Sequence, residues 1–350
     1  MKNTFLLFLC GMIMFGCQIQ TPPTGVWSKE RANEWYQQHE WIRGCNFTPS
    51  SAVNQLEMWQ ADTFDPETID RELGWAEELG FNCMRVFLHH LAWKSDRAGF
   101  KKRMEQYLQI ADKHGIKTMF VFFDDCWAPT YQIGKQPDPK PGVHNSGWLK
   151  DPGDMIFERP EETMNVLEEY VKDIIRTFKK DKRVLLWDLY NEPGKDYEEK
   201  SLPLLKNVFQ WAREINPEQP LSVCLWKKKY VELNNFQLAN VDIITYHTYN
   251  PAPEQQQAID TLKRYGRPII CTEYMARPFG STFQEIMPIL KRENIGAINW
   301  GLVAGKTNTN FAWGKGMPEV SEPPVWFHDI FRRDGTPFSQ EEVDFIKSLK

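Results

Sequence analysis

Two glutamates in this chain each follow a short apolar run, at a point where a buried strand would end. The run 184–190, VLLWDLY, predicts a fully buried parallel strand. Because proline cannot extend a strand ladder, Pro193 ends this strand and leaves Glu192 at its carboxyl end. Glu273 follows the apolar run 267–272 in the same way. Carboxyl groups placed like this can act as general acid, general base or nucleophile, provided that the fold brings them together.

Apolar segments alternate with helical segments along the chain and supply the strands that position these carboxyls. The predicted strands are residues 41–47, 81–88, 116–123, 184–190, 221–225, 241–247, 267–272 and 296–301. The predicted helices are residues 27–40, 66–80, 100–114, 161–180, 197–216, 253–265, 282–294 and 340–349. This alternation predicts an α/β fold, a single-domain (β/α)8 TIM barrel with the helix 27–40 across its floor.

Two long loops interrupt the pattern, residues 124–160 after the third strand and residues 302–326 after the eighth. An open, doubly wound sheet is the alternative fold. It would require a glycine-rich turn after its first strand, and residues 44–47 lack that spacing. The sequence therefore favours the barrel.

The carboxyl ends of barrel strands are where catalytic residues lie. Besides the two glutamates, these ends carry cationic, amide, imidazole, hydroxyl and indole groups: Arg85, Asp124, Asp125, Asn191, His247, Tyr249 and Trp300. Cleavage of a glycosidic bond requires one protonated and one ionised carboxyl, with donors that hold the sugar. The set suits that chemistry. Either aspartate is a candidate for binding substrate hydroxyls or for capping a loop, and Trp127 is a candidate for lining the cleft.

Composition limits the other classes of function. The chain has 350 residues with a net charge of −5 and no long basic run, so no nucleic-acid partner is expected. The 14 tryptophans offer flat faces that can stack on sugar rings. No C-x-x-C pair or His/Cys cluster has zinc spacing, so we expect no metal, no cofactor and no disulfide framework, and we expect a monomer.

The amino terminus predicts export. An apolar run of signal-peptide length follows Lys2 and ends at Gly16-Cys17, which resembles a bacterial lipoprotein cleavage site. We expect a signal peptide at residues 1–17 with Cys17 as the lipidated first mature residue, a tether at 18–26 and the catalytic domain at 27–350. The protein would then be exported and anchored to a bacterial membrane, at the periplasmic face or the cell surface. Plain secretion and a retained anchor are the alternatives.

The order of the strand-end residues resembles that of clan A glycoside hydrolases, and most of all family 5, the cellulase/mannanase family. The matching residues are Arg85 after the second strand, Asn191-Glu192-Pro193 after the fourth, His247-Thr248-Tyr249 after the sixth, Glu273 after the seventh and Trp300 after the eighth. The family usually carries a histidine after the third strand, whereas residues 123–127, FDDCW, have none. This difference indicates a divergent subfamily or a neighbouring family.

The resemblance implies a retaining double displacement, with Glu192 as acid/base and Glu273 as nucleophile. It implies that Arg85 keeps the nucleophile ionised and that Tyr249 holds its oxygen. It further implies that His247 supports the acid/base or the sugar. Asn191 would bind the substrate 2-hydroxyl, and Trp300 would form the floor of the −1 subsite.

These expectations make a retaining β-glycoside hydrolase, acting on an extracellular oligo- or polysaccharide of β-mannan or β-glucan type, the leading hypothesis. A glycan-binding surface lipoprotein that has lost catalysis is the alternative from another class. A metal-dependent barrel hydrolase is a third, and His89-His90 is the one histidine pair near a strand end that could serve it. The sequence leaves endo or exo cleavage open.

Overall fold

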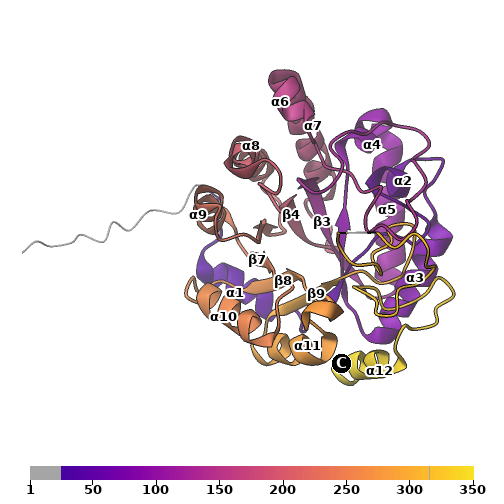
Figure 1. The fold of residues 1–350 in the computed structure, drawn as a ribbon. Coiled ribbons are helices and arrows are strands. Elements are labelled where there is room, and N and C mark those ends of the chain that lie inside the picture. Colours follow the sequence, from indigo (N-terminus) through magenta and orange to yellow (C-terminus); the bar gives the residue numbers. More distant parts are fainter. Residues whose placement is uncertain (1–24, 315) are drawn as a thin grey trace, which may run out of the picture.

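Short parallel strands form the centre of the molecule, and helices surround them (Figure 1). The computed structural model describes residues 25–314 and 316–350. Within this part of the chain the strands are β1 (Arg43–Asn46), β2 (Cys83–Phe87), β3 (Lys117–Asp124), β4 (Val184–Asn191), β5 (Leu221–Ser222), β6 (Cys224–Leu225), β7 (Ile244–His247), β8 (Ile269–Glu273) and β9 (Gly296–Trp300). They form one sheet in the order β5-β4-β3-β2-β1-β9-β8-β7-β6.

The two ends of this sheet come from a single predicted strand, residues 221–225. Its first half, β5, pairs with β4, and its second half, β6, pairs with β7, with the break at Val223. The sheet therefore closes on itself as a barrel of eight strand positions. The predicted (β/α)8 TIM barrel is confirmed.

The helices are α1 (Lys29–Gln37), α2 (Gln55–Trp59), α3 (Pro66–Leu79), α4 (His90–Ser95), α5 (Arg97–Lys113), α6 (Met155–Glu158), α7 (Pro160–Phe178), α8 (Leu202–Ile215), α9 (Val231–Asn240), α10 (Ala252–Lys263), α11 (Phe283–Arg292) and α12 (Gln340–Ser348). Their ends follow local chemistry. Asp65 caps α3 by accepting from the Thr68 amide, Pro66 opens the helix, and Gly80 ends it at φ 80°. Among the described residues, no helix combines the length and the apolarity needed to cross a membrane.

Several helical segments differ from expectation. The short helices α2, α4 and α6 were not predicted, and two further segments also differ. The predicted helix 197–216 begins as a short 3-10 turn, Glu198–Ser201, before α8 starts. The helix α9 was not predicted at all. It buries only Leu233 and Gln237, so its sequence lacks the apolar periodicity that identifies a helix. The last two differences lie in connections around the open end of the barrel.

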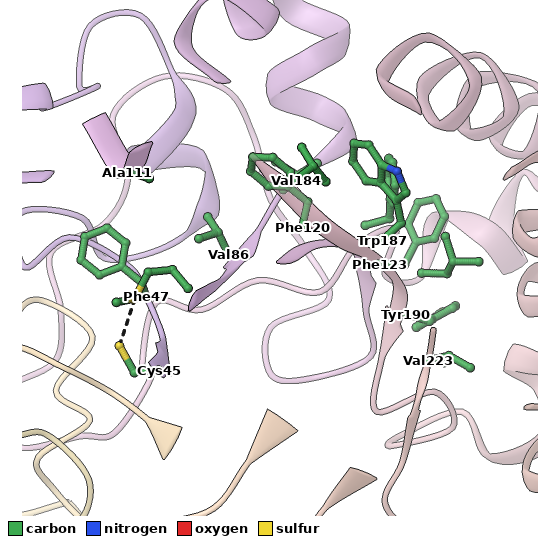
Figure 2. Packing of buried hydrophobic residues seen from close by; sticks show 14 of the residues in the cluster. Cys45, Phe47, Val86, Ala111, Phe120, Phe123, Val184, Trp187, Tyr190 and Val223 are labelled. Carbon is green, nitrogen blue, oxygen red and sulfur yellow. Dashed lines mark hydrogen bonds between the residues drawn. The ribbon is translucent and has the colours of Figure 1, made fainter. Parts of the chain in front are cut away.

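The core has two parts. Large side chains fill the space between the barrel and its helices, among them Phe120, Phe123, Trp187 and Tyr190 (Figure 2). A smaller cluster fills the barrel floor, where Trp27 and Tyr36, at and beside α1, pack against strand residues such as Ile298. The floor is thereby closed as predicted, which leaves the opposite, carboxyl end of the strands for a site.

Some predictions concern residues outside the described part of the chain. The signal peptide at residues 1–17, the lipidated Cys17 and nearly all of the tether 18–26 fall there. The five cysteines that the structure describes are all buried free thiols: Cys45, Cys83, Cys126, Cys224 and Cys271.

Candidate active site

A pocket of about 640 Å³ opens at the carboxyl ends of the strands. Glu192 and Glu273 lie in it, at the ends of β4 and β8, together with His247 from the end of β7. The sequence predicts that these three side chains meet. They do, because parallel strands of a closed barrel all end on the same rim.

The two carboxyl groups face each other across the imidazole of His247. Nδ1 of His247 lies 3.1 Å from Oε1 of Glu192 and 3.4 Å from Oε2 of Glu273. One side-chain atom from each of the three residues lies within 4.8 Å of the others. The backbone of Glu192 is left-handed, at φ 42°, a conformation that residues other than glycine rarely adopt and that is often found at functional sites.

Arg85 lies beneath the pocket, fully buried, and holds its floor together. Its guanidinium donates to Glu273 Oε1 at 3.0 Å, to Asp188 Oδ2 at 2.8 Å, and to the side-chain oxygens of Asn46 and Asn191 at 2.8 Å each. A buried cation is stable only when it is paired and hydrogen-bonded, and here two carboxylates meet it. Arg85 is not among the residues that line the pocket, so it acts on the nucleophile candidate from below and not as a sugar-binding donor.

Asp188 belongs to this network and was not predicted as a site residue. It is fully buried in the middle of β4, where it interrupts the apolar run VLLWDLY. A charged residue in such a run requires a partner, and this was the signal that could have linked it to Arg85.

Asn191 and Asp124 are joined to each other. The Asn191 amide donates to Asp124 Oδ1 at 2.9 Å, and the Trp148 indole donates to Asp124 Oδ2 at 2.8 Å. Asp124 therefore fills the corner at the end of β3 and fixes the amide of Asn191. Asp125 points elsewhere, toward Tyr190 and the Gly194 amide, so of the two aspartates only Asp124 lines the pocket.

Tyr249 and the tryptophans complete the lining. The Tyr249 hydroxyl donates to Glu273 Oε2 at 2.7 Å, as the resemblance implied. Trp300 and Trp127 both line the pocket, and Trp127 is 40% exposed. Trp313 stands edge-on to Tyr249 with a centroid separation of 5.0 Å. An exposed indole next to polar groups offers a platform for a sugar ring.

Two long loops, residues 124–160 and the described residues 302–314 and 316–326, are hydrogen-bonded to each other and together form the loop wall of the pocket. The Asn145 amide donates to the Thr307 carbonyl at 2.8 Å, and the Met317 amide donates to Gly142 at 3.0 Å. The Asn308 side chain donates to the Lys140 carbonyl at 3.0 Å. The wall therefore closes the pocket on the side of β3 and β9.

Residues that sequence reasoning missed lie at the opposite side. Lys195 Nζ is 3.4 Å from Glu192 Oε2, and Lys227 follows Trp226 on the loop after β6. On the side of the loop wall, the Cys126 thiol lies 3.4 Å from the same oxygen of Glu192, and it was not predicted either. These residues are in irregular loops, where no periodic pattern indicates which side chain faces the site.

Burial and charge perturb the acidic groups. Burial, followed by the charge of Glu192, raises the pKa of Glu273 to about 8. Burial also favours a neutral Glu192, but the hydrogen bond and charge of His247, and then the charge of Lys195, lower its pKa. Burial lowers the pKa of His247 to about 4, so the imidazole is neutral near neutral pH. Such perturbed groups in one pocket are typical of catalytic sites.

Other candidates lie away from the pocket. His89 and His90 are buried beside Asp151, and the His90 ring and amide both bond to its carboxylate. The Asp151 backbone pairs with Asp124, so this cluster fastens the loop wall to the end of β2. Arg277, which follows Glu273 by four residues, does not line the pocket either and bonds to Glu342 and to loop carbonyls.

The fold and site agree with the comparisons with known proteins. The family model "Cellulase (glycosyl hydrolase family 5)" matches residues 44–305. Comparison with curated proteins finds no match.

Solved structures share the fold at low sequence identity. GH5_18 from Streptomyces cattleya, in complex with Manb1-4GlcNAc, is 11% identical with a TM-score of 0.59, over 88% of this chain and 80% of that one. The endo-1,4-beta-D-mannanase from Thermotoga petrophila RKU-1 is 14% identical with a TM-score of 0.56, over 88% and 99%. The exo-beta-1,4-mannosidase Op5Man5 from Opitutaceae bacterium strain TAV5 is 15% identical with a TM-score of 0.59, over 88% and 58%.

Proposed function

Since the chain belongs to glycosyl hydrolase family 5 and is a glycosidase, we propose that it cleaves β-glycosidic bonds with retention of configuration. The observation that carries this proposal is the carboxyl pair, with an oxygen of Glu192, an oxygen of Glu273 and a nitrogen of His247 all within 4.8 Å. Retaining enzymes separate their carboxyls by about 5–5.5 Å, whereas inverting enzymes leave room for a water at about 6.5–9.5 Å. The close approach of the pair supports the retaining arrangement.

Hydrogen bonds support different roles for the two glutamates. Glu273 accepts from Arg85 and from Tyr249, one donor on each oxygen, and both donors stabilise its ionised form as a nucleophile. Glu192 faces His247, whose hydrogen bond lowers the pKa of Glu192, while burial raises the pKa of Glu273, so in the free site the shared proton is on Glu273. Because two facing carboxylates repel each other, the pair keeps one proton, and in our proposal that proton is on Glu192 when substrate binds.

The reaction then follows two steps. Glu273 attacks the anomeric carbon while Glu192 protonates the glycosidic oxygen, which releases the leaving sugar and forms a glycosyl ester. Glu192, now ionised, removes a proton from water, and the water oxygen displaces Glu273 from the anomeric carbon. Asn191, fixed by Arg85 and Asp124, presents an amide to the 2-hydroxyl of the sugar.

The loop wall favours a chain end as substrate. It closes the pocket beside Trp127 and Trp313, so a glycan cannot extend past that side without displacing a hydrogen-bonded loop. Several structural neighbours act on or bind β-mannosides by their names, and one is an exo-mannosidase. We therefore propose release of a terminal sugar from a β-mannan- or β-glucan-type chain outside the cytoplasm.

The test is hydrolysis of reduced β-manno- and β-gluco-oligosaccharides, with proton NMR of the anomer first released. We expect the β-anomer of a monosaccharide from the non-reducing end. Glu192→Gln and Glu273→Gln should each lower kcat by about 10²–10⁴-fold on these unactivated substrates. A first product of the α-anomer would contradict retention, and random internal cuts would contradict the terminal mode.

The same variants address the alternative of a glycan-binding protein without catalysis. In that case wild type and Glu273→Gln would bind oligosaccharide equally and neither would release sugar. The intact carboxyl pair and its Arg85 network support the enzyme instead, because an inactive site has no need of a buried cation beneath Glu273.

Anchoring at Cys17 and export remain part of this proposal. A lipid anchor would hold the enzyme close to incoming glycan. Expression of the full chain with Cys17→Ser should move the protein from the membrane fraction to the soluble exported fraction. An unchanged membrane fraction would contradict the anchor without affecting the catalytic proposal.

A further inference from the structure

The side of the pocket opposite the loop wall carries positive charge. Lys195 and Lys227 both line the pocket, and both ammonium groups lie over the indole of Trp226, at 4.8 Å and 5.4 Å from its centre. The indole itself is fixed, because its Nε1 donates to the Pro193 carbonyl at 3.1 Å. Trp226 therefore holds two cations at a defined place by cation–π attraction.

Nearby carboxylates do not neutralise this pair. Asp196 is bound to Lys150 at 2.5 Å, and Glu198 lies 3.7 Å from Lys229. Glu199 accepts from the Glu232 and Leu233 amides at the start of α9. Among the described residues, Lys195 has only Glu192 as an ion-pair partner and Lys227 has no carboxylate within 4.0 Å.

The position of these cations relative to the two glutamates identifies the part of the substrate that they meet. Lys195 contacts Glu192, and it makes no contact within 4.0 Å with Glu273. Under the proposed mechanism Glu192 protonates the oxygen of the leaving group, so the leaving group has to lie on the Glu192 side of the reacting carbon. The two lysines and Trp226 adjoin that side.

We propose that Lys195, Lys227 and Trp226 form a leaving-group subsite for a sugar that carries an anionic substituent, either a uronate carboxylate or a sulfate ester. The inference rests on the proposed function and specifies its substrate class. Two ammonium groups that share a carboxylate or sulfate gain charge-assisted hydrogen bonds, whereas a neutral sugar would leave Lys227 unpaired. The subsite thus selects an acidic branch or an acidic penultimate residue.

Lys195 also links binding to catalysis. Its charge favours ionised Glu192, which opposes the role of Glu192 as proton donor. An anionic group that binds both lysines offsets this charge only while substrate is present. An anionic substrate would therefore favour protonated Glu192 while the substrate is bound, which is when Glu192 has to protonate the glycosidic oxygen.

The first experiment keeps the reacting sugar constant and changes only the leaving group. It compares 4-nitrophenyl β-mannoside with its 3-carboxy derivative, using the β-glucosides if the mannosides are not cleaved. At low salt we expect kcat/KM to be about fivefold higher for the carboxylated substrate. This preference should vanish in Lys227→Ala and at high salt, and it should persist in Lys228→Ala, a neighbouring exposed lysine that does not line the pocket. Equal kcat/KM for both substrates in the wild type would overturn the inference and leave the glycosidase intact.

A binding experiment separates the subsite from catalysis. Isothermal titration of the full chain with methyl β-glucuronide, glucose 6-sulfate and neutral methyl β-glucoside tests the carboxylate and sulfate sources directly. Tighter binding of one or both anions that depends on Lys227 and not on Lys228 supports the subsite even if no aryl glycoside is cleaved. Equal affinity for all three, or equal losses in both lysine variants, would overturn it. Failure of hydrolysis alone would count against the proposed function only.

Discussion

The two sides of the pocket are built in opposite ways. The loop wall is fastened by backbone hydrogen bonds between two long loops and by buried polar side chains, and it presents Trp127 and Trp313 to the pocket. The opposite side is formed by exposed lysines on an indole, with Glu192 as the only carboxylate partner of Lys195 within the described residues. A rigid aromatic surface selects by shape, whereas an exposed charge selects by the charge of its partner.

The same contrast separates the two cations that contact the carboxyl pair. Arg85 touches Glu273 from beneath, fully buried, and also binds Asp188. Lys195 touches Glu192 from the solvent side, with 44% of its side chain exposed. Removing the buried Arg85 leaves two buried carboxylates without their cation, whereas Glu192 keeps its hydrogen bond to His247 when the half-exposed Lys195 is removed. We therefore expect Arg85→Met and Lys195→Met to lower the stability of the protein by unequal amounts.

The largest expected effect follows from Arg85→Met. Since Asp188 and Glu273 both lose their partner in the interior, the free energy of unfolding should fall by about 3–5 kcal/mol. The activity should fall by at least about 100-fold, because the stabilising charge on the nucleophile is lost. Urea denaturation and steady-state kinetics measure the two quantities.

Lys195→Met is the matched control for the loss of stability expected in Arg85→Met. Its exposed ion pair is worth less than about 1 kcal/mol, so its unfolding midpoint should stay close to that of the wild type. Equal destabilisation by the two substitutions would remove the distinction between the buried and exposed sides.

A smaller effect is expected from Trp313→Ala in the loop wall. The indole packs on Tyr249 and lines the pocket, so its loss removes a face on which the terminal sugar can stack. KM should rise about tenfold, with a smaller change in kcat, and internal cuts should appear in the product profile. Phe279→Ala is a useful comparison, since Phe279 also lines the pocket and contacts Trp313 but offers a smaller ring, so its loss should raise KM less. If Trp313→Ala changes neither KM nor the products, the wall does not define the terminal mode.

How much the sequence could predict depended on the kind of element. The positions of Glu192 and Glu273 were predictable because each follows an apolar run, and in the first case a proline also ends the strand. Arg85 was expected to meet a carboxylate, and it does. A charge buried in an apolar strand is stable only when it is paired. Applied to Asp188 as well as to Arg85, this reasoning would have predicted their ion pair.

Other features carried no local signal. The break at Val223 falls inside the short run LSVCL, which contains no glycine or proline, so only the closure of the barrel reveals it. The sequence does not distinguish tryptophans that face the pocket from those in the core: Trp127 lines the pocket, whereas Trp59 on α2 and Trp93 on α4 are fully buried in the core. Lys195, Trp226 and Lys227 come together from two separate loops, and their proximity depends on tertiary structure.

The smallest expected effect concerns pH. The proton that the carboxyl pair holds is lost as pH rises through about 8, the value to which burial and the charge of Glu192 raise the pKa of Glu273. The kcat/KM of the wild type should therefore fall above that pH, since the acid form of the pair is required. The positive charge of Lys195 favours the ionised pair, and its removal makes the proton harder to lose. Lys195→Met should accordingly move this alkaline limb upward, by about half a pH unit for an exposed charge.

The direction of that shift distinguishes the role of Lys195 from a general effect of net charge. Lys228→Met removes the same charge from the same side of the pocket but makes no contact with either glutamate, so its alkaline limb should coincide with that of the wild type. A limb that moves equally in both variants would mean that the field of the whole lysine-rich loop, and not the contact with Glu192, sets the pKa. A downward shift in Lys195→Met would mean that Lys195 helps the pair to keep its proton. Either result would contradict the view that the charged side of the pocket is neutralised by its substrate, because only a lysine that opposes protonation of Glu192 gains from an anionic leaving group.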